Sequence, residues 1–534
     1  MAGNFIGVDP QGKNGVDSSA VTRGSQVVVQ AASGNTIGGT TPDARNVILG
    51  GVVLAGGANG NHVLGNYIGT DATGTATLGG TTDGVSLQGA DNAIGAPGGG
   101  NLIAGQAGAG IRLSYFGGDD SGNLVQANRI GTNAAATAAL GNGSDGILLD
   151  LGATGNTIGG TAAGAGNVVG GSGENGITIA GGSTGNQVEG NFVGTDPSGT
   201  VMLPNAESGV RIQGISDGNT VGGTASGAGN VVAFNHGPGI SIDDVNPNVH
   251  DAILGNSIYD NDGLGIDLLP EGVNPNSPAN VSTNGPNALQ NYPTLTSAAG
   301  AVDGDTWTVA GTLDSHPNAT FRLEFFASPA CDASGHGEGR TFVGTADVVT
   351  GPSGPEAFSA VLPAFVAGGQ AITATATSAD SNTSEFSTCV TSTGPAVRPT
   401  KCTAASCDDG NPCTVDVCSV LTCDHRDAIG FASVRCIFDS KGLKAPLCTG
   451  THLPASVGKQ INHARQLVDR AAAAASKKQR KLLKAARQAI TQVRHAVKKL
   501  GHKAARRQCT DPLGALLADA QRRADALLKT LGGH

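Results

Sequence analysis

Aromatic and charged residues are scarce in this sequence, and their scarcity excludes several classes of protein. Of the 534 residues, 3% are aromatic and 14% are charged, whereas a typical globular domain carries about 25% charged residues. The low charge excludes disorder driven by self-repulsion. No stretch approaches the roughly 18 apolar residues of a membrane-spanning helix. Glycine is abundant, with 85 residues in no three-residue period, which excludes collagen and indicates a β architecture with many tight turns.

One phrase recurs through the first half of the chain. GNFIGVD at Gly3 returns as GNYIGTD at Gly65, ANRIGTN at Ala127 and GNFVGTD at Gly190, a period of 62 to 63 residues. Shorter phrases such as DGVSL and NGITI alternate within it, so each period holds two structural turns of about thirty residues. Strands this short bury their Val, Ile and Leu side chains only by stacking. We therefore predict a parallel β-helix over residues 1–292, with Ile68 and Ile130 in one column.

The repeat places asparagines and longer insertions at fixed positions. Asn66, Asn128, Asn191 and Asn256 occupy matching corners, where stacked amides can form a hydrogen-bonded ladder. This predicts a structural role for them. The insertions recur at every second coil and are expected to project from one edge. Because solenoid loops commonly carry binding sites, they are the predicted contact for a polysaccharide or matrix polymer.

These phrases resemble the right-handed parallel β-helix repeat of the pectate-lyase-like superfamily. They are most similar to bacterial surface and secreted proteins with GNTIGGT and GNxIGTDxxGT coils, over roughly residues 3–293. The resemblance implies the fold but no single activity, because this fold hosts lyases, hydrolases, adhesins and passive stalks.

The composition changes after the repeat. Trp307 and seven of the thirteen Phe lie between 294 and 394, among six alternating segments that begin near residues 306, 320, 342, 357, 371 and 384. Such strands with Gly and Pro turns predict a β-sandwich over 293–395. Cys331 and Cys389 are its only cysteines, and we expect them to form a disulfide.

Seven cysteines crowd into residues 396–450. The segment CDDGNPCTVDVCSVLTCDH resembles the DGNPCT-type disulfide repeats of extracellular proteins, which implies a disulfide-rich module. A zinc site made by Cys418, Cys423 and His425 is the alternative. The CxxC pairs typical of metal ribbons are absent, which favours disulfides.

Residues 451–534 carry 18 Lys and Arg against four Asp, a balance of +14, and the rest of the chain has a balance of −24. Apolar residues at three- and four-residue steps predict helices. A bond between Cys448 and Cys509 would require segments 456–475 and 477–500 to fold back as a hairpin. The charge predicts an anionic surface polymer as partner, and a solvated bundle with basic faces is the alternative. The lack of aromatic residues excludes base stacking, and we expect no sequence-specific nucleic acid.

Candidate catalytic and metal-binding residues are few. Asp243, Asp244 and His236 are the best candidates for a polysaccharide lyase or glycoside hydrolase acting on an acidic polysaccharide, but polygalacturonase-like motifs fail to match in order and place. A cluster of Asp260, Asp262 and Asp267 could hold calcium, and ordinary surface acids are the alternative. No other cofactor is expected.

The favoured hypothesis is a non-catalytic extracellular or cell-surface protein whose rod displays loops for adhesion. Residue 3 already lies within a repeat phrase, and no secretion signal precedes it. Solenoids need capping coils, so we expect the native chain to begin upstream of Met1.

Overall fold

The computed structural model describes residues 1–16, 27–114, 120–243, 250–281, 285–301, 304–396, 414–419, 422–427, 430–439, 455–500 and 504–531. The chain divides into two compact units, Met1–Arg398 and Pro399–His534.

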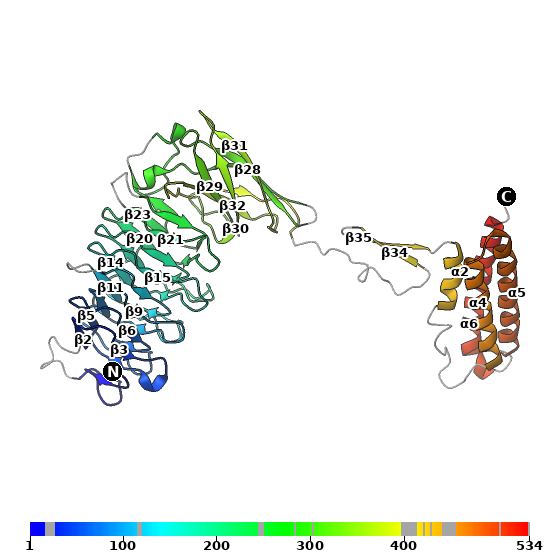
Figure 1. Ribbon diagram of the computed structural model, residues 1–534, viewed down its shortest axis with the longest axis horizontal. Coiled ribbons are helices and arrows are strands. Elements are labelled where there is room, and N and C mark those ends of the chain that lie inside the picture. Colours follow the sequence, from blue (N-terminus) through cyan, green and yellow to red (C-terminus); the bar gives the residue numbers. More distant parts are fainter. Residues whose placement is uncertain are drawn as a thin grey trace. The chain divides into compact units, whose positions relative to one another are not determined.

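The first unit begins with three parallel sheets that wind into a β-helix, the rod in Figure 1. The β1 sheet contains, in order, β1 (Phe5–Ile6), β4 (Val47–Ile48), β7 (Tyr67–Ile68), β10 (Leu102–Ile103), β13 (Arg129–Ile130), β16 (Val168–Val169), β19 (Phe192–Val193), β22 (Val231–Ala233) and β25 (Ser257–Tyr259). The β2 sheet contains β2 (Val27–Gln30), β5 (Val52–Ala55), β8 (Val85–Leu87), β11 (Ile111–Ser114), β14 (Ile147–Asp150), β17 (Ile177–Ile179), β20 (Val210–Gln213), β23 (Ile240–Asp243) and β26 (Ile266–Leu268). The β3 sheet contains β3 (Thr36–Gly38), β6 (His62–Leu64), β9 (Ala93–Ile94), β12 (Leu124–Val125), β15 (Thr157–Gly159), β18 (Gln187–Glu189), β21 (Thr220–Gly222) and β24 (Ala252–Leu254).

Each coil contributes one strand to each sheet, except that the last coil, with β25 and β26, has none in the β3 sheet. The coils stack in register. Ile68 pairs with Ile103, which pairs with Ile130. All three side chains are fully buried in the column that runs along the rod. The predicted stacking is confirmed, with one intermediate coil in each long period.

The asparagines at the corners form hydrogen-bonded ladders along the rod. In the first ladder each Nδ2 donates to the Oδ1 of the next residue at 2.8–3.0 Å, in the order Asn46, Asn66, Asn101, Asn128, Asn167, Asn191, Asn230, Asn256. A second ladder, at 2.9–3.1 Å, runs through Asn35, Asn61, Asn92, Asn123, Asn156, Asn186, Asn219 and Asp251. The four asparagines singled out from the sequence thus lie in one ladder, with Asn101, Asn167 and Asn230 between them.

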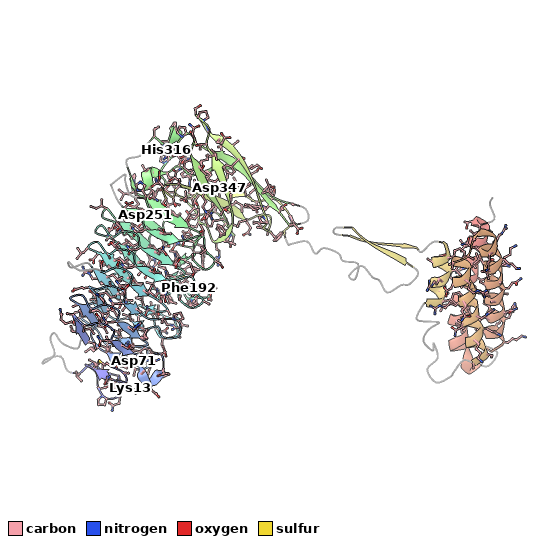
Figure 2. All side chains as sticks on the ribbon, in the orientation of Figure 1. Lys13, Asp71, Phe192, Asp251, His316 and Asp347 are labelled. Atoms are coloured by element: carbon pink, nitrogen blue, oxygen red, sulfur yellow. A yellow bond between two sulfur atoms is a disulfide. The ribbon has the colours of Figure 1, made fainter. Side chains whose placement is uncertain are left out.

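The long insertions fold as short hairpins beside the β1 sheet. Their antiparallel bridges are Val8 to Gly15, Thr70 to Thr77, Thr132 to Ala139 and Thr195 to Met202. Successive hairpins contact one another, since Ala72 N donates to Gly12 O at 2.7 Å and Ala134 N donates to Gly74 O at 2.9 Å. Lys13 and Asp71, from the first two hairpins, lie close together near the start of the rod (Figure 2). The insertions therefore cover the β1 sheet more than they project from it.

A β-sandwich follows the rod after two short 3₁₀ helices, η2 (Pro278–Asn280) and η3 (Pro286–Leu289). A third, η1 (Pro42–Ala44), lies within the rod. One sheet contains β27 (Thr294–Gly300), β28 (Trp307–Leu313) and β31 (Glu356–Leu362). The other contains β30 (Thr341–Val349), β29 (Thr320–Ser328), β32 (Ala371–Ser378) and β33 (Val390–Thr391). Between them lies a core that includes Trp307, Phe321 and Phe325.

The sequence prediction of a strand beginning near residue 384 was largely wrong. Only Val390–Thr391 forms a strand there, because the preceding residues close the end of the rod. Thr383 Oγ1 accepts a hydrogen bond from Ile253 N at 2.9 Å, Glu385 Oε1 accepts one from Leu268 N at 3.2 Å, and Phe386 packs in the rod's core. The predicted disulfide between Cys331 and Cys389 is confirmed.

The second unit contains a hairpin and four described helices. The hairpin is formed by β34 (Thr414–Ser419) and β35 (Thr422–Asp427), and the helices are α2 (Gly430–Asp439), α4 (Ala455–Ala472), α5 (Ser476–Leu500) and α6 (Ala504–Thr530). Val434, Ile437 and Phe438 of α2 pack in the core of the other three helices, although sequence analysis assigned this segment to the cysteine module. None of the described helices has the length and apolarity to cross a membrane.

Candidate functional site

The residues proposed for an enzyme have separate partners. Asp243 Oδ2 lies 2.7 Å from Arg211 Nε on the outer face of the β2 sheet, and burial raises the pKa of Asp243 against the effect of this arginine. His236 Nδ1 lies 2.9 Å from Asp262 Oδ2 at an exposed corner between the β1 and β2 sheets. Asp244 lies outside the described residues. Among the described residues, Asp243 and His236 thus belong to two separate ion pairs. The negative charges of Glu271 and Asp267 lie near enough to Asp243 to interact with it.

The proposed calcium ligands also diverge. Asp260 lies 3.5 Å from Arg340 Nη1, Asp262 pairs with His236, and Asp267 accepts a hydrogen bond from Gly272 N at 3.2 Å. Burial raises the pKa of Asp267 to about 6, which disfavours the charged form that calcium needs. The described part of the chain contains no group of three or more His, Cys, Asp or Glu side chains that could hold a metal ion.

The acids of the hairpin insertions are used by their own turns. Asp196 Oδ1 accepts hydrogen bonds from Thr200 N at 3.1 Å and Val201 N at 2.9 Å. Partial burial raises the pKa of Asp196, but these hydrogen bonds lower it further, to about 2. Asp71 makes the equivalent bonds to Thr75 and Ala76. These carboxylates therefore hold the hairpins and are poorly placed to bind a ligand.

The cysteine predictions of the second unit lie largely beyond the described side chains. Cys448 lies outside the described residues, and Cys509 lies in α6 where only the backbone is described. Cys418 on β34 lies opposite Cys423 on β35. Cys423 is two residues before His425. Both the disulfide between Cys448 and Cys509 and the choice between disulfide and zinc stay predictions.

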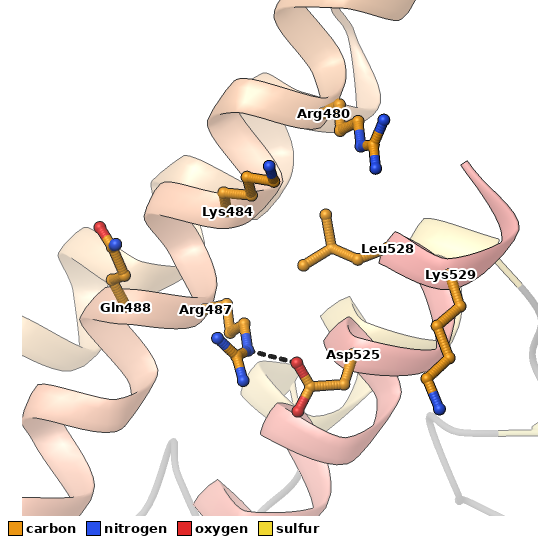
Figure 3. Close-up of a pocket in the computed structure, with 7 residues that line it drawn as sticks. All are labelled: Arg480, Lys484, Arg487, Gln488, Asp525, Leu528 and Lys529. Atoms are coloured by element: carbon orange, nitrogen blue, oxygen red, sulfur yellow. Dashed lines mark hydrogen bonds and ion pairs between the residues drawn. The ribbon is translucent and has the colours of Figure 1, made fainter. Parts of the chain in front are cut away.

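A basic groove lies between α5 and α6. It has a volume of about 700 Å³ and is lined by Arg480, Lys484, Arg487, Gln488, Asp525, Leu528 and Lys529. Figure 3 shows the arginines and Lys484 on α5, with Asp525, Leu528 and Lys529 on α6. We call this surface the α5–α6 groove.

The sequence positions these cations through the burial of the opposite helix faces. On α5, Leu483, Ala486 and Ile490 are buried at three- and four-residue steps, so the intervening charged positions face solvent. On α6, Leu517 and Ala524 are buried in the same core. Arg480, Lys484, Arg487, Arg494 and Lys498 are spaced by four, three, seven and four residues, which places them along one stripe of α5.

Most of the groove's positive charge is unneutralised. Arg487 pairs with Asp525 (Figure 3), and Arg494 Nη1 donates to Gln521 Oε1 at 2.7 Å. These two contacts show that α5 and α6 run antiparallel. Within the described part of the chain, Arg480, Lys484 and Lys529 lie within ion-pair distance of no carboxylate. The groove therefore presents three uncompensated cations and suits an anionic ligand.

The sequence predicted a basic helical surface but not this groove. The stripe on α5 was visible as spacing in the sequence, whereas Lys529 and Asp525 join it only through the packing of α6. In comparisons with known proteins, no protein-family model and no curated protein matches the chain.

Proposed function

We propose that the protein is a non-catalytic extracellular or cell-surface β-helix protein whose helical unit binds an anionic surface polymer through the α5–α6 groove. The observation that carries the proposal is the convergence of Arg480, Lys484, Arg487 and Lys529 on one groove with a single carboxylate. A repeating row of cations matches the repeating charges of a polyanion, and the attraction weakens with salt.

The rod supports a structural role. Its corner asparagines are paired in ladders, and Asp243 and His236 form separate ion pairs. A rigid rod of this kind can act as a spacer between two binding sites of a protein. The contact of the rod with a polysaccharide or matrix polymer belongs to the same proposal.

The groove can be tested with full-length chain and polymers of defined charge. Long-chain inorganic polyphosphate, dextran sulfate and polygalacturonate are compared with neutral dextran by a salt titration of binding. The double substitution Arg480→Gln and Lys484→Gln removes two groove cations. We expect it to weaken polyanion binding roughly ten- to thirty-fold, at about 1 kcal/mol per cation.

The matched control removes two exposed cations elsewhere on the same helix. Lys481→Gln with Lys499→Gln changes the net charge equally outside the groove lining, and we expect at most a threefold loss of affinity, roughly 0.6 kcal/mol. Equal losses in the two double variants would contradict the groove and indicate diffuse attraction.

Catalysis is tested separately on a panel of acidic polysaccharides. We expect no release of reducing ends and no unsaturated product from the full-length chain. Activity that Asp243→Ala abolishes would overturn the non-catalytic proposal.

A further inference from the structure

A second pocket lies where the sandwich meets the last coils of the rod. It has a volume of about 590 Å³ and lies between the corner loop 223–229, which joins β21 to β22, and strands β29, β30 and β31 of the sandwich. Figure 1 shows the sandwich at this end of the rod. We call it the junction pocket. The α5–α6 groove of the second unit contributes no residue to the junction pocket.

A buried carboxylate holds an arginine in this pocket. The Glu324 side chain is 1% exposed, and its Oε1 accepts a hydrogen bond from Arg322 Nε at 2.9 Å. Its Oε2 accepts a second one from Gly255 N of the rod at 2.7 Å. Both oxygens of Glu324 are thus occupied, and the guanidinium is fixed by one edge.

The other edge of the guanidinium is open. In the described chain, the Nη1 and Nη2 groups of Arg322 have no hydrogen-bond partner, and the side chain is 32% exposed. Asp347 is its cross-strand neighbour on β30 but lies beyond ion-pair distance. An arginine held through Nε presents the remaining N–H groups in a fixed plane, which suits ligand oxygen atoms.

The walls of the junction pocket are apolar on one side and polar on the other. Phe342 is 42% exposed and packs edge-on against Phe326, with ring centroids 5.7 Å apart. Val361 is 64% exposed beside it. Across the pocket, Thr224 and Ser226 are exposed, and their hydroxyls have no hydrogen-bond partner in the described chain.

We propose that the junction pocket binds a saccharide unit of a glycan chain. A pyranose ring has apolar C–H faces that pack on Phe342 and Val361, and a rim of oxygen atoms that accept from Arg322 and exchange hydrogen bonds with Thr224 and Ser226. Arg322 takes either hydroxyl or carboxylate oxygens of the sugar. This inference rests on the extracellular role proposed above, but it names a different site for the carbohydrate contact than the rod's insertions.

Binding of neutral and uronic oligosaccharides to the full-length chain tests the proposal. Phe342→Ala removes the apolar wall, and Arg322→Lys keeps the charge but loses the planar donor pair. We expect each variant to weaken binding of the same oligosaccharide at least tenfold. Thr224→Val with Ser226→Ala, which leaves the Arg322–Glu324 pair intact, should weaken it by a smaller factor.

Two control variants separate this site from the other features. Val349→Ala, an exposed residue at the far end of β30, and the groove variant Arg480→Gln with Lys484→Gln should both bind the oligosaccharide normally. Absence of binding to every neutral and uronic oligosaccharide would overturn the junction pocket and leave the α5–α6 groove standing. Binding that persists unchanged in Phe342→Ala and in the Thr224→Val, Ser226→Ala variant would also overturn it.

Discussion

The rod and the helical unit differ in where their polar side chains lie. In the rod, polar side chains are buried and paired with their equivalents one coil away, as Asn128 is with Asn101 and Asn167. In the helical unit, the apolar side chains are buried and the cations remain on the surface, as Arg480 and Lys484 do.

This difference shows which polar groups are available to a partner. The donor and acceptor groups of an amide in a ladder are already hydrogen-bonded within the fold, and removing the amide leaves its buried partners unpaired. An exposed cation without a carboxylate contributes little to the fold and is free to bind. Substitutions should therefore damage stability in the rod and binding in the helical unit.

The largest effect is expected from breaking a ladder. Asn128 is buried, donates to Asn167 Oδ1 at 2.9 Å and Ile94 O at 2.7 Å, and accepts from both nitrogens of Asn101. We expect Asn128→Ala to lower the free energy of unfolding by about 4 kcal/mol, since several buried partners lose their bonds. Urea unfolding followed by circular dichroism measures this.

The matched control for the ladder is Gln187→Ala, at an exposed position of β18 in the same rod. It should change stability by less than about 0.5 kcal/mol. An equally small loss in Asn128→Ala would show that the ladder adds nothing to the fold.

The next largest effect is expected to be a pH dependence of stability, which arises where residues of the sandwich close the end of the rod. Glu338 accepts hydrogen bonds from Asn261 N and Nδ2, and Glu385 accepts them from Leu268 and Asn274. Burial raises the pKa of both carboxyls to about 7 from an ordinary value of 4.5. The folded state thus holds their protons more tightly than the unfolded state does.

Stability from these groups is complete below pH 4.5 and is lost as the pH rises through 7. Each unit of raised pKa corresponds to about 1.4 kcal/mol. We expect the unfolding temperature of the first unit to fall between pH 5 and pH 8, and Glu338→Gln to flatten the slope. A stability that rises over this range would contradict the assignment.

A smaller effect is expected at the hairpin insertions. Asp196→Ala removes the acceptor for Thr200 N and Val201 N and should cost about 1 kcal/mol, seen as faster proteolysis within residues 195–202. Asp196→Asn is the control, because Asn133 holds the equivalent turn through a bond from Thr137 N at 2.9 Å. The stabilisation by Asp196 should persist above pH 3.8 and disappear as the pH falls through 2, since its pKa is lowered.

The repeats allowed the rod to be predicted because its contacts are periodic in sequence. The column containing Ile68 and Ile130 follows from a period of 62, although Ile103 between them lies in a less similar phrase. The strand predicted near residue 384 does not form, because Thr383 and Glu385 instead contact residues of the rod that lie more than a hundred positions earlier in the sequence. The junction pocket has no sequence signal, since Thr224 and Arg322 meet only through the docking of the sandwich.

The smallest effect on stability is expected where the effect on binding is large. Arg480 and Lys484 are like charges at i and i+4, a spacing that destabilises a helix by about 0.2–0.5 kcal/mol. The double variant Arg480→Gln, Lys484→Gln should therefore unfold at the same or a slightly higher temperature than the parent chain, while its affinity for polyphosphate falls. The repulsion between Arg480 and Lys484 does not stabilise the fold. If the double variant is as stable as the parent chain or more stable, and binds polyphosphate more weakly, the two cations serve binding and not folding. Loss of stability together with binding would instead make the groove part of the bundle's own packing.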